Sequence, residues 1–416
     1  MGTDHSTDAE RSTTGFAAYR ELLRAPGARS LALASALGRL PNGMVGLGLI
    51  LFLHERTGSF GSAGLVTGGW VLGLGLTGPV LARLIDRLGS RPVIVAGGLA
   101  SAVALALVVV LGRAGAGAGV LAAMTVLVGG AMPPIGGVVR RRWGDLVPAT
   151  SLPTAYAVDG VMLESIFIAG PALTGLLATL FGAGDALLVA AVVGAVGAVW
   201  FSTLVHFPPR DAAAAAERHW AGALRSPVVR LLVATGLAMG AGIAGVELAL
   251  PAFGAAHGNA ALGGPLSATL ALGSLLGGLA YGARADAFGS PPRALVALGT
   301  LQGLSAAPML LVGGKAEMFA AAALAGLCWA PLNTVRTRLI QARVEAATVI
   351  EAFTWDGLSE TLGAGISTAL AGPLVASQGW RAAVLVACAL PLAGGLIAFL
   401  GRAVTAPGLP GTTPAR

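Results

Sequence analysis

Charged residues are scarce in this chain of 416 residues: 11% are charged, whereas 55% are hydrophobic. In a soluble globular protein about a quarter of the residues are charged. This composition therefore excludes a soluble globular protein and indicates a membrane protein. Lysine is nearly absent: the chain has one lysine, Lys315, and 25 arginines. The arginines are scattered at the ends of apolar runs. In spite of a net charge of +7, this scatter excludes the clustered basic face that nucleic-acid binding requires.

Cysteine is scarce as well, and catalytic motifs are missing. Cys328 and Cys388 both lie in apolar runs, which excludes a disulfide framework or a metal site. We find no paired nucleophile and base and no phosphate-binding loop after a strand, and we expect no metal and no cofactor. Residues 73–78 (GLGLTG) fit a dinucleotide fingerprint, but they lie inside an apolar run, where glycines serve helix packing. A membrane enzyme or a non-transporting receptor is therefore a remote alternative.

Long apolar runs dominate the chain. A run of about 20 residues crosses a hydrocarbon core of roughly 30 Å as a helix. Twelve such runs predict an all-α membrane protein with twelve transmembrane helices. They cover about residues 30–53, 60–83, 92–112, 118–139, 153–178, 186–206, 229–253, 263–283, 294–313, 317–336, 349–374 and 382–402.

The arginines set the expected orientation. Of the segments between these runs, those on one side hold most of the arginines, whereas the other side holds only Arg56, Arg113, Lys315 and Arg381. Because cytoplasmic loops are rich in Lys and Arg, we predict a multi-pass protein of the cell membrane with both termini in the cytoplasm.

An internal repeat divides the chain into two halves. Residues 82–91 read ARLIDRLGSR and residues 282–290 read GARADAFGS. Asp159 and Gly160 recur as Asp356 and Gly357, at an offset of 197. The repeat predicts two pseudo-symmetric bundles of six helices. The expected parts are a cytoplasmic tail 1–28, a bundle 29–206, a cytoplasmic linker 207–227, a second bundle 228–403 and a cytoplasmic tail 404–416.

The loop between the second and third runs carries the pattern D-R-x-G-x-R, formed by Asp86, Arg87, Gly89 and Arg91. With the two halves of six helices, this loop closely resembles that of the major facilitator superfamily, and the resemblance covers about residues 20–405. It implies two helical bundles around a central cavity that opens to one side at a time. It also implies a cytoplasmic gate, to which we assign Asp86, Arg87, Gly89, Arg91, Arg140, Arg141, Asp286 and Gly289.

Ionisable residues inside the runs are candidates for function, because an ionisable group in the membrane is costly. By residue count, Arg39, Glu164 and Glu360 lie near the midplane, and Glu247 lies in the external third. One arginine faces five carboxylates, and a medium of low dielectric disfavours that many uncompensated charges. We therefore predict that one or two of five carboxylates exchange protons during transport: Asp159, Glu164, Glu247, Asp356 and Glu360.

The same excess of carboxylates favours a cationic or weakly basic amphipathic substrate. The alternative is that Arg39 binds an anionic group directly. The residues expected to line the substrate cavity are Arg39, Asn42, Tyr156, Phe167, Trp329, Asn333, Phe353 and Trp355.

Direction of transport is indicated by a partial motif. Residues 170–175 (GPALTG) are similar to the G-P-x-x-G-G element of antiporters in this superfamily, although Thr174 replaces a glycine. We therefore expect a monomer that resembles drug/proton antiporters and exports small molecules, with the proton gradient as its energy source. Proton-coupled uptake and facilitated diffusion remain alternatives.

Overall fold

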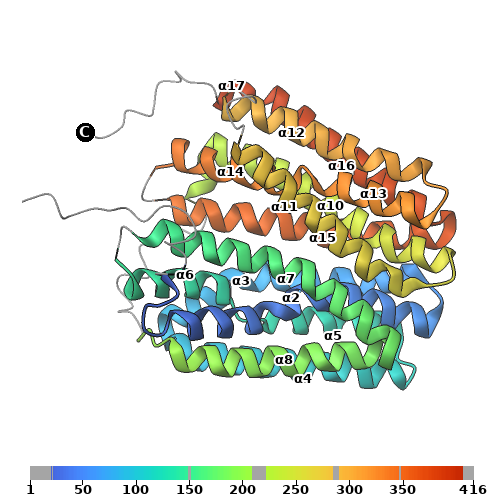
Figure 1. The fold of residues 1–416 in the computed structure, drawn as a ribbon, viewed down its shortest axis with the longest axis horizontal. Helices are drawn as coiled ribbons and strands as arrows, with labels where there is room; N and C mark the ends of the chain where they lie inside the picture. Colours follow the sequence, from blue (N-terminus) through green and yellow to red (C-terminus); the bar gives the residue numbers. More distant parts are fainter. Residues whose placement is uncertain are drawn as a thin grey trace, which may run out of the picture.

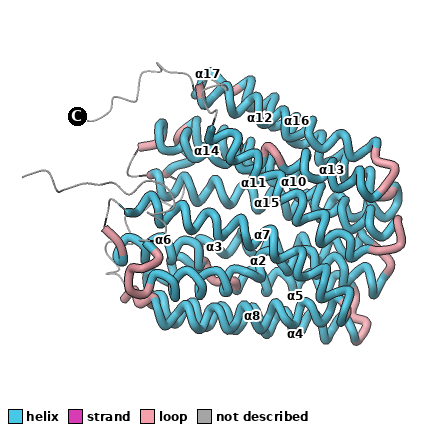
Figure 2. Tube along the Cα trace, viewed as in Figure 1, coloured by secondary structure: helices cyan, strands magenta, loops and turns pink. Residues whose placement is uncertain are grey.

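The computed structural model describes residue 20 and residues 22–148, 151–208, 222–283, 290–345 and 348–405. Every regular element in these ranges is helical (Figures 1 and 2). Two predicted gate residues, Asp286 and Gly289, lie outside the described residues. The side chains of Tyr156 and Glu164 lie outside them too, although the backbone at both positions is helical.

Within the described ranges the first half has seven helices, drawn in blue to green in Figure 1. Its fourth predicted span is broken at residues 132–134, because consecutive prolines at 133 and 134 remove two backbone donors. The helices are α2 (Ala28–Thr57), α3 (Phe60–Leu88), α4 (Ser90–Arg113), α5 (Ala118–Ala131), α6 (Ile135–Leu146), α7 (Leu152–Phe181) and α8 (Ala183–Leu204).

The second half repeats this order. Its fourth predicted span is also broken, at residues 327–328. Its long helices are α10 (Pro227–Ala256), α11 (Gly263–Ala283), α12 (Pro291–Ala306), α13 (Lys315–Gly326), α14 (Trp329–Arg343), α15 (Val349–Gln378) and α16 (Trp380–Leu400). Its short elements are η2 (Ala223–Arg225), η3 (Ala260–Leu262), η5 (Ala307–Leu311) and α17 (Arg402–Thr405).

The helical membrane fold predicted from the sequence is confirmed. Within the described ranges, eleven helical segments are long and apolar enough to cross a membrane. The other predicted span corresponds to α15, which has 30 residues and packs against α3 and α10. It is not among the eleven, and its first half carries Glu351, Asp356 and Glu360. The count of twelve transmembrane helices stays a prediction.

Among the described residues, the hydrophobic cluster that the two halves share lies at one end of the bundle. We call the end where α2 begins the proximal end, and the end where α2 finishes the distal end. One hydrophobic cluster contains residues of both halves from the distal side, such as Leu49 and Phe253. Towards the proximal end each half has a cluster of its own, around Trp143 in the first half and Leu339 in the second.

Glycines allow the halves to approach closely in their distal parts. A Cβ atom on Gly64 of α3 would lie 2.8 Å from the Cα atom of Gly372 of α15. A Cβ atom on Gly175 of α7 would lie 3.1 Å from the Cα atom of Gly264 of α11. Any side chain at these positions would push the helices apart, so the glycines permit backbone contact across the halves.

Candidate functional site

A cavity of about 590 Å³ lies between the halves, lined by α2, α3, α6 and α7 on one side and by α10, α11, α13, α14 and α15 on the other. Its distal floor includes Thr67 and Thr368, close to the contact between Gly64 and Gly372. The walls are largely apolar, with convergent polar groups, as in sites for small molecules. Among the side chains that the structure describes, three charged ones line it: Arg140, Glu247 and Glu360.

Four of the predicted lining residues line the cavity: Asn42, Phe167, Trp329 and Asn333. Three predictions need correction. Arg39 is 4% exposed and is held by a buried carboxylate instead of facing the cavity. Phe353 and Trp355 pack against the proximal hydrophobic cluster of the second half, because the first turns of α15 lie beside α14 there.

In the first half, two arginines share one carboxylate. Arg39 Nη2 donates to Asp159 Oδ1 at 2.6 Å, and Arg140 Nε donates to Asp159 Oδ2 at 3.3 Å. Arg39 and Asp159 are buried, whereas the Arg140 side chain is 61% exposed and lines the cavity. Arg39 Nε also donates to the carbonyl of Ser35 at 3.2 Å. This cluster carries one more positive than negative charge.

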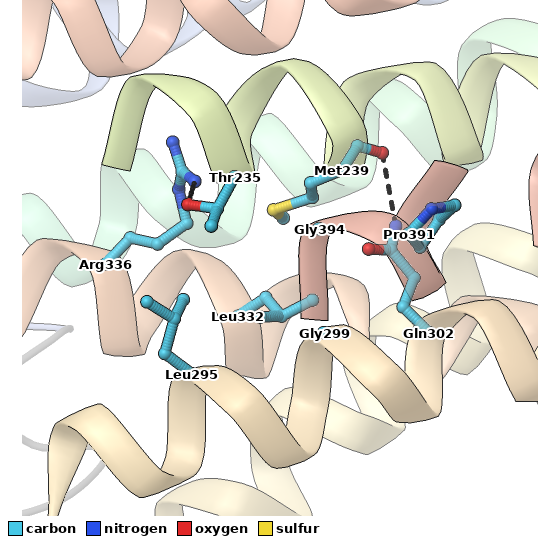
Figure 3. A pocket seen from close by; sticks show the side chains of 9 residues that line it. All are labelled: Thr235, Met239, Leu295, Gly299, Gln302, Leu332, Arg336, Pro391 and Gly394. Carbon is cyan, nitrogen blue, oxygen red and sulfur yellow. Dashed lines mark hydrogen bonds between the residues drawn. The ribbon is translucent and has the colours of Figure 1, made fainter. Parts of the chain in front are cut away.

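In the second half, one arginine serves two carboxylates. Arg336 of α14 is fully buried, and its Nη2 donates to Asp356 Oδ1. Its Nη1 donates to two groups of α10, the carbonyl of Leu232 at 3.0 Å and Thr235 Oγ1 at 3.1 Å (Figure 3). Its Nε lies 3.2 Å from Glu360 Oε1, an ion-pair distance at which the two groups are not aligned for a hydrogen bond. This cluster carries one more negative than positive charge.

Arg336 is the residue that sequence reasoning missed. It is the last residue of the predicted tenth span, whereas the prediction counts Arg39 as the only embedded arginine. That interpretation is wrong, because α14 continues to Arg343 and places Arg336 two turns inside the helix. A signal was present: Arg336 precedes Asp356 by 20 residues, as Arg140 precedes Asp159 by 19.

A small pocket of about 10 Å³ lies beside Arg336, within the second half (Figure 3). Gln302 Nε2 donates there to the carbonyl of Met239 at 3.2 Å, while Gln302 Oε1 is buried without a hydrogen-bond partner. This volume is close to the smallest that holds one water molecule. The pocket is thus too small for a substrate, and the larger cavity is the candidate site.

Glu247 differs from the other embedded acids. Its side chain is exposed to the cavity and has no ion-pair or hydrogen-bond partner among the described residues. On the same helix α10, Gly240 packs against the backbone of Glu360. Glu247 follows Gly240 by seven residues, so it lies roughly 10 Å farther towards the distal end. The second half therefore presents two acids to the cavity at different depths.

The predicted gate loop lies at the proximal end. Gly89, with φ of 88°, joins α3 to α4, and only glycine adopts this backbone without strain. Arg87 and Arg91 are exposed, and Asp86 is half-buried. Arg141 lies over the ring of Phe207 at 3.8 Å from its centroid, within the first half. The gating role of these residues stays a prediction.

Comparison with known proteins gives both a family and a fold. The sequence model of the Major Facilitator Superfamily matches residues 31–301. An uncharacterized MFS-type transporter of Sinorhizobium fredii, y4rN, is 28% identical over 191 residues, which are 46% of this chain and 47% of that protein. The match thus spans about half the length of that relative.

Two solved structures share the fold. The nucleoside transporter NupG superposes with a TM-score of 0.69 at 14% identity, covering 90% of this chain and 98% of NupG. A POT family transporter in complex with a thioalcohol-conjugated peptide has a TM-score of 0.68 at 12% identity, covering 89% of this chain and 95% of that one. At such identities the likeness extends to the fold alone.

Proposed function

Because the chain belongs to the Major Facilitator Superfamily, we propose that it is a secondary transporter that works by alternating access. We propose further that it exports small amphipathic compounds of cationic or weakly basic character in exchange for protons. The observation that carries this proposal is the cavity of about 590 Å³ between the halves, with Glu247 and Glu360 on one wall.

Alternating access is supported by the way the halves meet. They share a hydrophobic cluster and glycine contacts at the distal end, and they have separate clusters at the proximal end. Two bodies joined at one end can rock about the central cavity, so that the distal contact opens as the proximal one closes. Arg87 and Arg91, exposed at the proximal end, are available to form that second contact.

Coupling to protons is supported by Glu247. A carboxylate that faces a largely apolar cavity and has no cationic partner among the described residues attracts either a proton or a cationic group. The two occupants exclude each other at one carboxylate. Exclusive occupancy by a proton or a substrate is the physical basis of exchange, since binding of one then requires release of the other.

The proposal of export rests on residues 170–175 (GPALTG), which are similar to the antiporter element, and on a conformation in which an exporter would load. In the predicted topology the proximal end faces the cytoplasm, and the structure has its contact between the halves at the distal end. A cavity in this state would load from the cytoplasm. The second candidate is proton-coupled uptake, favoured by the two acids of the cavity wall, since one can hold a proton while the other holds a cationic group.

The test is transport by the purified full chain in proteoliposomes with an imposed pH gradient, scored with cationic, neutral and anionic amphiphiles. We expect cationic compounds to drive proton movement in the direction opposite to their own. The variant Glu247→Gln should abolish this exchange, whereas Glu317→Gln, at an exposed position in the first turn of α13, should leave it intact. Movement of protons and solute in the same direction would establish uptake, and proton movement with anions alone would refute the charge preference.

A further inference from the structure

The cavity has a charged group on its other wall that the proposed function does not use. Arg140 of α6 lines the cavity with a side chain that is 61% exposed. Its Nε contacts Asp159 at 3.3 Å, and its two Nη atoms have no hydrogen-bond or ion-pair partner among the described residues. The end of a guanidinium with unused donors is therefore presented to the cavity.

Among the described side chains, the local charge balance leaves Arg140 without full neutralisation. Asp159 is its ion-pair partner, but the other oxygen of Asp159 accepts from the buried Arg39 at 2.6 Å. One negative charge cannot compensate two positive ones. The surplus positive charge lies on Arg140, because Arg39 is buried and fixed by Ser35 and Asp159, whereas Arg140 reaches the cavity.

The unmatched charges of the two walls lie at different depths. Arg140 lies six residues from the proximal end of α6, whereas Glu247 lies nine residues from the distal end of α10. Glu360, between them in depth, has Arg336 at 3.2 Å. The cavity is thus positive on the first half near its proximal end and negative on the second half towards its distal end.

We infer that Arg140 forms a subsite for an oxyanion such as a carboxylate, and that the preferred substrate is an elongated ampholyte. Its basic group faces Glu247 and its acidic group faces Arg140. Arginine suits this role because its planar fork donates two parallel hydrogen bonds to a carboxylate. This inference rests on the proposed function, since it assigns a second recognition group to the same substrate.

The test compares two ligands that differ by one group: an arylalkyl amine, and the same amine with a carboxylate at the far end of the molecule. Binding to the purified full chain is measured by titration calorimetry. We expect Arg140→Gln to weaken binding of the amino acid about tenfold, the loss of one charge-assisted contact of roughly 1.4 kcal/mol. Binding of the plain amine should change less than about twofold, and Arg140→Lys should retain part of the affinity for the amino acid.

Arg142→Gln is the matched control, because Arg142 lies on the same helix and pairs with Asp145 at 3.9 Å outside the cavity wall. It should bind both ligands like the parent chain.

Two outcomes would overturn the inference. An equal loss of affinity for both ligands in Arg140→Gln would assign Arg140 to a gate, and an unchanged affinity for the amino acid would show that Arg140 does not bind its carboxylate. If Arg140→Gln does not fold, Arg140→Lys decides by the same comparison of two ligands. The plain amine in the parent chain separately tests the proposed function.

Discussion

Each half of the molecule holds a cluster of charged side chains inside the helical bundle, at related positions but with opposite proportions of acid and base. In the first half, Arg39 and Arg140 share Asp159; in the second half, Asp356 and Glu360 share Arg336. Asp159 and Asp356 correspond in the repeat, so the duplication kept the central acid and the charges around it diverged. An arginine keeps its charge in a protein, whereas a carboxylate can take up a proton. The first cluster is therefore permanently charged, and the second is able to exchange protons.

The largest effect should follow removal of the shared acid of the first half. Asp159→Asn leaves Arg39 buried without its carboxylate, and breaking a buried pair in this way costs about 3–5 kcal/mol of unfolding free energy. Because arginine cannot release its proton, the loss should be the same at pH 5 and pH 8. Thermal unfolding of the purified protein in detergent measures it.

Asp185→Asn is the control for this variant. It breaks a pair with Arg113 at 2.7 Å in which both side chains are about half exposed. Such pairs contribute at most about 1 kcal/mol. A loss for Asp159→Asn as small as that of the control would show that Arg39 finds another partner, and the contrast between the halves would then be wrong.

Removing the shared arginine of the second half should give a loss that depends on pH. Arg336→Met leaves Asp356 and Glu360 near each other without a cation and should cost about 3 kcal/mol at pH 8. Protonation of one acid removes the uncompensated charge, so stability should recover as the pH falls. Unfolding midpoints from pH 8 to pH 5 would reveal the recovery. If the loss of stability does not vary with pH, the second cluster does not exchange protons, and the contrast between the two clusters is wrong.

The helical membrane fold could be predicted from the sequence, because long apolar runs are a local pattern. The charge clusters could be predicted only in part. Asp159, Asp356 and Glu360 were found because acids inside apolar runs stand out. Arg336 was missed because it is the last residue of the predicted tenth span, and a span boundary from hydropathy is uncertain by several residues.

Which side of a helix faces the cavity was also beyond the sequence. Arg39 and Asn42 are three residues apart on α2, yet Asn42 lines the cavity and Arg39 is buried against Asp159. Phe353 and Trp355 occupy the first turns of α15, where they pack against the second half. These outcomes depend on the packing of neighbouring helices, which no single run of sequence encodes.

Substitutions on either side of the contact between the halves should have the same effect, in contrast to substitutions in the two charge clusters. Gly64 and Gly372 face each other: a Cβ atom on Gly64 would meet Gly372 Cα at 2.8 Å, and one on Gly372 would meet Gly64 Cα at 3.0 Å. Gly64→Ala and Gly372→Ala should therefore each weaken the distal contact by about 1–3 kcal/mol, the usual cost of overpacking. Both should shift the protein towards the state open at the distal end.

Spin-label distances across the distal and proximal ends would measure that shift, with Gly137→Ala as the control because a Cβ atom there meets nothing within 4 Å. A longer distal and a shorter proximal distance in both variants is the expected result. If only one of the two glycine variants shifts, the contact is not shared equally by the halves. The surrounding helix, and not the close approach itself, would then determine which end is closed.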